Sequence, residues 1–169
     1  MPLRTRDPDI DPEWTVSVDP AGSKDTYAAW WCGGRLVGVG VFDPRDKMIR
    51  NLRANVIMED QFGKHRGDRL LKLAKYSGWL IGTMGRELHD VDWVQPSVWK
   101  AALCKRSAPK TRRIEDYFVH IAIIKTLTKT EQIPYLTCLE TSGSASVHSD
   151  IADSVGIGLY ACGRIHAVL

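Results

Sequence analysis

Alternating apolar and polar positions predict a hairpin meander at the start of the chain. Residues 14–19, WTVSVD, alternate in this way and run into the turn-forming stretch PAGSKD, as expected of a buried strand. Residues 26–42 predict two further strands joined at Gly33–Gly34, because paired glycines favour a tight hairpin turn. The first thirteen residues lack such a pattern, so we expect a flexible arm over 1–13 and a single domain over 14–169.

Short strands and helical periodicities alternate along the rest of the chain. The predicted elements are a strand over 54–60, a helix over 64–88, a strand over 91–95, a helix from Pro96, an amphipathic helix over 108–128 and a last helix from about His148. Residues 131–146, EQIPYLTCLETSGSAS, are irregular by composition and predict no element. This order predicts a mixed α/β fold, in which a three-strand meander feeds parallel strands flanked by helices.

Acids recur where these predicted elements begin or end. Asp19 ends the first strand and Glu59 ends the fourth, so their carboxylates lie side by side if these strands are parallel neighbours. Asp150 and Asp153 fall in the first turn of the predicted last helix, on one face, since residues three apart share a face. Acids near a helix N-terminus also complement the helix dipole, and Asp150 is a suitable capping residue.

Four clustered carboxylates repel one another unless cations neutralise them. Hard oxygen ligands select magnesium or manganese, and two such ions about 3.5–4 Å apart clamp the attacking and leaving oxygens of a phosphodiester. The catalytic ligands of two Mg²⁺ ions, with Mn²⁺ as a substitute, are therefore predicted to be Asp19, Glu59, Asp150 and Asp153. Strand alternation favours Glu59 over the adjacent Asp60 as a ligand.

The composition is that of an ordinary globular domain. The chain has 169 residues, of which 44% are hydrophobic and 25% are charged. Its apolar runs are too short to span a bilayer, and its N-terminus carries no apolar signal segment. We expect a cytoplasmic protein with no membrane partner. The four cysteines show no ligand spacing, which argues against a zinc site.

Charge is unevenly distributed along the chain, despite a net charge of only +3. Residues 100–113, KAALCKRSAPKTRR, contain basic residues and no acid, and a second basic cluster runs over 63–75. Beside a predicted acidic centre, such clusters indicate an anionic polymer as ligand. The residues of the first run expected to contact the phosphates of such a polymer are Lys100, Lys105, Arg106, Lys110, Arg112 and Arg113.

Four motifs resemble those of RuvC-type Holliday junction resolvases. VSVDPAGS at 16–23 resembles their first-strand motif, and VIMEDQF at 56–62 resembles an apolar strand that ends in Glu with an aromatic three residues later. VQPSVWKAALCKRSAPK at 94–110 is similar to a segment in which Val-Lys precedes a Ser-Ala-x-Lys loop. DIADSVGIG at 150–158 resembles their closing Asp-x-x-Asp helix. The motifs occur in the family's order across nearly the whole chain.

The resemblance implies a ribonuclease H-like fold and a magnesium-dependent endodeoxyribonuclease. It implies a homodimer that cuts four-way DNA junctions symmetrically and needs no nucleotide cofactor. The family's four metal-binding catalytic positions correspond to Asp19, Glu59, Asp150 and Asp153. Lys100 and Lys110 match basic residues that contact DNA, and Phe62 matches an aromatic that works at the junction centre. The candidate dimer interface is the long helix over 64–88, where Gly78 and Gly82 allow close approach.

The chain also departs from the family pattern. Its connection between the third and fourth predicted strands is shorter than in bacterial resolvases, so the family's first helix is expected to be lost or reduced. Such a compact form suits a phage-encoded enzyme. Some relatives carry His where Asp150 stands, which leaves open whether His148 or Asp60 assists the metals.

Two alternative functions stay open at this point. The nuclease domain of a large phage terminase subunit has the same fold and similar acids, but it normally follows an ATPase domain, and no GxxxxGK[ST] loop occurs here. A non-catalytic nucleic-acid-binding module on the same fold is the second alternative. Retention of all four acids argues against it.

Overall fold

The computed structural model describes residues 11–20, 25–46, 53–60, 67–104 and 112–166. Its strands are β1 (Asp11–Asp19), β2 (Tyr27–Cys32), β3 (Arg35–Val41), β4 (Ala54–Glu59) and β5 (Val91–Val94). Its helices are α2 (Asp68–Thr83), the short 3-10 helix η1 (Leu88–Asp90), α3 (Pro96–Cys104), α4 (Arg112–Thr126), α5 (Lys129–Thr141) and α6 (Ala145–Ala161).

The five strands form one mixed sheet in the order β3-β2-β1-β4-β5. β1 pairs antiparallel with β2 and parallel with β4, while β5 extends the sheet as a second parallel pair. Gly33 and Gly34, at φ of 55° and 76°, form the hairpin turn between β2 and β3, a conformation that glycine adopts without strain. The predicted meander, the parallel pairing and the mixed α/β class are confirmed.

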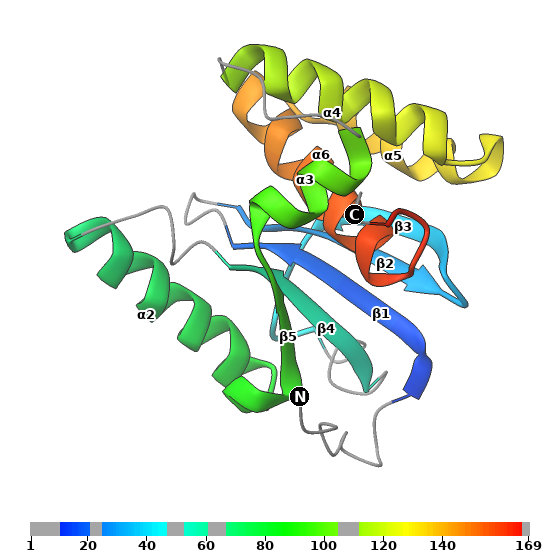
Figure 1. Ribbon diagram of the computed structural model, residues 1–169. Coiled ribbons are helices and arrows are strands. Elements are labelled where there is room, and N and C mark those ends of the chain that lie inside the picture. Colours follow the sequence, from blue (N-terminus) through cyan, green and yellow to red (C-terminus); the bar gives the residue numbers. More distant parts are fainter. Residues whose placement is uncertain (1–10, 21–24, 47–52, 61–66, 105–111, 167–169) are drawn as a thin grey trace.

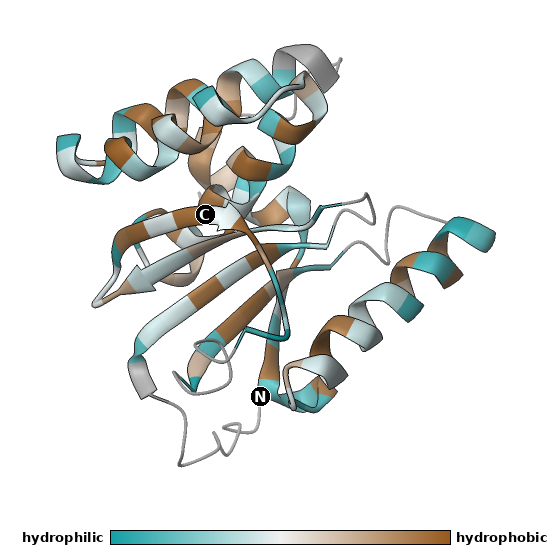
Figure 2. Ribbon diagram, turned by 180° about the vertical axis from the view of Figure 1, so that it is seen from behind, coloured by the Kyte–Doolittle hydropathy of each residue, from teal (hydrophilic) through white to brown (hydrophobic). Residues whose placement is uncertain are grey.

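Helices cover both faces of this sheet (Figure 1). Of the α-helices in the described ranges, α2 covers one face, and α3, α4, α5 and α6 cover the other. Figure 2 shows the apolar residues concentrated on the strands between these layers. The apolar cluster on the α2 side includes Val16, Val18, Val56, Met58, Leu80 and Ile81. The cluster under the other helices includes Trp31, Ile57, Trp99, Ile123, Tyr135 and Val155.

Side chains alternate between the two faces along a strand, and this alternation places the two strand-end acids on the same face of the sheet. Val18 and Met58 point toward α2, so their neighbours point toward the α6 side of the sheet. Ser17, on this other face of β1, donates from Oγ to the Ser154 carbonyl oxygen of α6 at 2.7 Å. Asp19 and Glu59 therefore project toward the helix that carries the last acids.

Two tryptophans set how closely α6 lies on the sheet. A methyl group added at Gly156 would fall 2.3 Å from the Trp99 ring, and one added at Gly158 would fall 2.0 Å from the Trp31 ring. Trp31 Nε1 also donates to Ser17 Oγ at 3.0 Å. Because only glycine leaves room for these rings, α6 packs against the sheet in one defined position.

The sequence-based analysis did not predict the helix α5. Residues 131–146 were expected to be irregular, yet most of them belong to a helix that begins at Lys129 and includes Pro134. Thr128 and Glu131 form a reciprocal capping box at its start. Burial of Tyr135 and Cys138 adds tertiary packing that outweighs the single backbone hydrogen bond lost at proline.

Several predicted boundaries also shift. α6 begins at Ala145, capped by the Ser144 side chain, and not near His148. β1 begins at Asp11, so it includes the last three residues of the predicted N-terminal arm. α2 begins at Asp68 and ends at Thr83, inside the predicted range of 64–88, and α4 ends at Thr126, two residues before the predicted end. Within the described ranges, no helix is long and apolar enough to cross a membrane.

The candidate metal centre

Three predicted ligands meet at one point between the sheet and α6. Asp19 ends β1 beside the end of β4, because Val18 pairs with Met58 in the parallel register. Asp153 reaches the same point from α6. One carboxylate oxygen from each of Asp19, Glu59 and Asp153 lies within 4.8 Å of the others. We call these three residues the acidic triad. They are 3%, 5% and 9% exposed, so their charges lie almost out of water.

Asp150 lies at the margin of the acidic triad. It is half-buried, one turn before Asp153 on α6. Its negative charge contributes to raising the pKa of Asp19, which indicates proximity, but it is not among the three oxygens that converge. Because α6 begins at Ala145, neither aspartate of this helix lies in its first turn. The helix dipole and N-capping therefore do not explain them.

The acidic triad carries more negative charge than its surroundings favour. Burial raises the pKa of Asp19 well above its usual range, and the charges of Glu59 and Asp153 raise it further. Burial also raises the pKa of Asp153 to about 7, although the Lys100 ammonium lowers it. Buried like charges of this kind are stabilised by a bound cation. Three carboxylates with converging oxygens fit a hard divalent cation such as Mg²⁺ or Mn²⁺.

Lys100 lies inside this centre. Its Nζ forms ion pairs with Asp153 Oδ2 at 3.2 Å and with Glu115 Oε1 at 3.1 Å, and it lies 5.1 Å from the centroid of the Trp99 ring. Burial disfavours the charged ammonium, but the carboxylates of Asp153 and Glu115 raise the Lys100 pKa overall. The predicted contact of Lys100 with DNA stays a prediction, and its position next to Asp153 was not foreseen.

Two further side chains of the centre were missed by sequence reasoning. Trp99 is completely buried, and its Nε1 donates to Glu59 Oε1 at 3.0 Å. Glu115 is the second partner of Lys100 and comes from the first turn of α4. The acidic pair Glu115–Asp116, one residue after the basic run, was the available signal, but nothing in the sequence indicated which way the side chains point.

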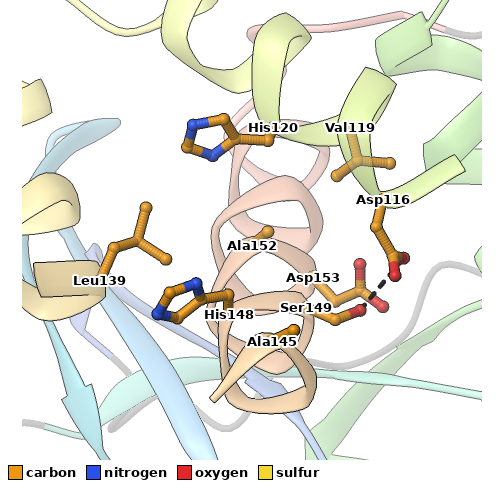
Figure 3. A pocket seen from close by; sticks show the side chains of 9 residues that line it. All are labelled: Asp116, Val119, His120, Leu139, Ala145, His148, Ser149, Ala152 and Asp153. Atoms are coloured by element: carbon orange, nitrogen blue, oxygen red, sulfur yellow. Dashed lines mark hydrogen bonds between the residues drawn. The ribbon is translucent and has the colours of Figure 1, made fainter. Parts of the chain in front are cut away.

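A cavity of about 170 Å³ opens beside Asp153, between α4, α5 and α6 (Figure 3). Asp116 and Ser149 line one side of it, with Ser149 Oγ donating to Asp116 Oδ1 at 3.2 Å. His120 and His148 line the other side. His148 Nε2 lies 2.9 Å from the Ser142 carbonyl oxygen, and His148 is not part of the acidic triad.

The remaining predicted site residues are placed as follows. Asp60 follows β4 and its backbone N–H donates to the Val94 carbonyl oxygen at 2.7 Å; it does not belong to the acidic triad. Arg112 and Arg113 open α4, but their side chains are not among those described. Four others lie outside the described residues, namely Phe62, Lys105, Arg106 and Lys110. The connection before β4, which was predicted to be shortened, also falls partly outside them, at 47–52.

Comparisons with known proteins identify the fold. No family model and no curated protein matches this chain. The solved structure of Thermus thermophilus RuvC matches with a TM-score of 0.50 and 16% identity, over 92% of this chain and 99% of that one. RuvC of the same organism in complex with Holliday junction substrate has a TM-score of 0.47 and 15% identity, with the same coverage. The first match shows that this chain has a RuvC-like fold, which confirms the predicted ribonuclease H-like architecture.

Proposed function

We propose that this protein is a metal-dependent endonuclease that cuts four-way DNA junctions. The observation that carries this proposal is the acidic triad: three buried carboxylates converge where β1 and β4 end in a RuvC-like fold. The four sequence motifs that resemble junction resolvases support the substrate class. A cytoplasmic location in a bacterial cell or a phage-infected host stays a prediction.

The side chains of the centre have distinct roles in this proposal. Asp19, Glu59 and Asp153 hold two divalent cations, with Asp150 completing the set at the margin. When bound, two such ions lower the pKa of a water nucleophile and stabilise the leaving oxygen of a phosphodiester. Burial of the acidic triad strengthens the electrostatic attraction between its carboxylates and the cations. Mg²⁺ is the proposed natural cation, and Mn²⁺ the substitute.

Paired incisions across a four-way junction need two such centres related by a dyad, and a C2 homodimer supplies them most simply. The helix α2 is the proposed interface. Leu71 and Trp79 on this helix are 55% and 45% exposed, so they offer apolar surface that a partner subunit would cover. Among the described residues, nothing lies within 4 Å of a methyl group added at Gly78 or Gly82, so a partner helix has room to approach.

Digestion of an immobile four-way junction tests the proposal. With Mg²⁺, the wild-type chain should produce paired symmetric nicks in the junction and should leave duplex and flap controls uncut. Asp19→Asn should bind the junction and cut none of it, since the lost charge holds the cation. Glu140→Gln, an exposed acid on α5, is the matched control and should cut normally.

Each other outcome contradicts a different part of the proposal. Equal cutting of duplex DNA would favour a terminase-type nuclease. Junction binding without cutting in either Mg²⁺ or Mn²⁺ would indicate a non-catalytic module. Full Mg²⁺-dependent activity of Asp19→Asn would eliminate the metal centre as the catalytic site.

A further inference from the structure

Trp99 contacts two of the elements that supply residues of the acidic triad. It lies on α3, which follows β5 directly, and its side chain is completely buried. Its indole N–H donates to Glu59 Oε1 at 3.0 Å. Its ring packs against Gly156 so closely that an added methyl group would fall 2.3 Å away. One side chain thus contacts the strand that supplies Glu59 and the helix that supplies Asp153.

The two contacts have different consequences. A carboxylate held by one N–H donor loses rotational freedom, so the Glu59 carboxylate is fixed before any cation arrives. The ring contact at Gly156 lies one turn after Asp153, so it fixes the height of that turn of α6 above the sheet. A metal centre needs both the orientation and the spacing of its ligands.

We propose that Trp99 is a positioning residue of the metal centre, whose indole N–H orients the Glu59 carboxylate for divalent cation binding. Ring packing alone would be satisfied by any aromatic of this shape. The N–H adds a function that packing does not require, because it is directed at the carboxylate of a triad residue, Glu59, rather than at a backbone carbonyl. The inference rests on the proposed function only in requiring that the acidic triad binds a divalent cation.

Trp31 is a matched control within the same chain. It is also completely buried, its ring also packs against a glycine of α6, and its Nε1 also donates to a side-chain oxygen at 3.0 Å. Its acceptor is the Ser17 hydroxyl, which is not a triad ligand. Loss of the two N–H groups should therefore have similar effects on packing and different effects on cation binding.

Mn²⁺ titration of the full chain, followed by the electron paramagnetic resonance signal of free Mn²⁺, tests the inference. Two variants are used at each position: Trp→Phe, and replacement by 3-benzothienylalanine, which keeps the bicyclic shape and lacks the N–H. At position 99 both should weaken Mn²⁺ binding about 10–100-fold, as loss of a ligand's hydrogen-bond partner typically does. At position 31 Mn²⁺ affinity should be unchanged. Melting temperatures in EDTA should fall similarly at the two positions.

The outcomes separate this inference from the proposed function. Wild-type Mn²⁺ affinity in the benzothienylalanine variant at position 99 would overturn the role of the N–H, even if Trp99→Phe bound weakly. Equal loss of affinity at positions 31 and 99 would show a general packing effect and would also overturn it. A wild-type chain that bound no Mn²⁺ would overturn the proposed metal centre, and this inference with it.

Discussion

Two sites in this molecule bury acidic side chains, and the pKa values of these acids are shifted in opposite directions. Glu131, which is 4% exposed, accepts hydrogen bonds from the backbone N–H groups of Leu36 and Thr128 and forms an ion pair with Arg164. Burial alone would raise the pKa of Glu131, but these partners lower it to about 2. In the acidic triad, burial and neighbouring acids raise the pKa of Asp19, and that of Asp153 to about 7.

The partners of the acids differ between the two sites. Hydrogen bonds from Arg164, Thr128 and Leu36 favour the charged form of Glu131, whereas neighbouring carboxylates disfavour the charged form of Asp19. The two sites also differ in charge balance. Glu131 is a single acid with its own arginine, whereas several acids at the triad share Lys100. At the first site the lowered pKa means that the charged form of Glu131 is favoured in the folded chain, so this acid has a structural role. The second has more carboxyl groups than basic groups, and the raised pKa values show that their charged forms are disfavoured unless a cation binds.

The largest expected effect is a loss of cleavage when a triad acid is replaced. Loss of a residue that only hydrogen-bonds to a metal ligand typically costs up to roughly 100-fold in activity. Asp153→Asn removes a ligand itself, so it should lower junction cleavage by more than that. Its melting temperature in EDTA at about pH 8 should not fall, since burial disfavours the charge that the substitution removes. Cleavage assays and thermal unfolding measure the two effects. A strongly destabilised variant would mean that Asp153 is a structural acid like Glu131.

The second effect is a loss of stability at the structural site. Glu131→Ala leaves Arg164 and two backbone N–H groups without their acceptor, and should cost about 3 kcal/mol of unfolding free energy. For a chain of this size that corresponds to a fall in melting temperature of about 10 °C. Cleavage per folded molecule should persist at lower temperature. The control is Glu140→Ala, an exposed acid of the same helix, and an equal change in both would contradict the assignment.

A smaller effect is expected in the pH dependence of the cation-free chain. Asp153 has a folded-state pKa of about 7 against an ordinary value of 3.8, so between these values the folded chain binds more protons than the unfolded chain. In EDTA, the unfolding free energy should therefore rise as the pH falls from about 8 to about 5. Asp153→Asn should flatten this rise. A rise of the same size in the variant would contradict the raised pKa.

Glu131 should give the opposite pH dependence of the unfolding free energy, over a lower pH range. Its lowered pKa contributes stability that is complete above about pH 4.5 and is lost as the pH falls toward about 2. It therefore does not affect the measurement between about pH 5 and about pH 8. A stability difference between wild type and Glu131→Gln that stayed constant down to about pH 2 would contradict the lowered pKa.

The smallest expected effect concerns basic side chains: two lysines of the basic run and the arginine of the structural site. Lys100→Ala should shallow the slope of log junction affinity against log salt concentration by about 1, since each phosphate contact releases counterion. Lys110→Ala, elsewhere in the basic run, should do the same. Arg164→Lys, at the structural site, should leave the slope unchanged. Unchanged slopes in both lysine variants would show that neither lysine contacts DNA.

The sequence contained enough to predict the position of Asp19 and Glu59. Both follow apolar strands, and the parallel pairing of β1 with β4 makes adjacent strand ends meet. Strand parity also favoured Glu59 over Asp60. The closing Asp-x-x-Asp motif indicated Asp153 correctly as a member of the cluster, although the expected helix start was wrong by three residues.

The rest depended on tertiary packing that no local pattern encodes. The contact of Trp99 with Glu59 arises because the fold brings α3 next to the end of β4. From the sequence pattern alone, Trp99 would be predicted only to be a buried core residue. α5 was missed because Pro134 and several polar residues outweighed a recognisable signal. That signal was Thr128 followed three residues later by Glu131, a capping box.

The central claim is that the acidic triad binds divalent cations, and anomalous diffraction from Mn²⁺-soaked crystals of the wild-type chain tests it most directly. The account predicts anomalous peaks coordinated by Asp19, Glu59 and Asp153, and no such peaks in crystals of Asp19→Asn. Mn²⁺ bound elsewhere, with the triad carboxylates contacting only protein and water, would contradict it.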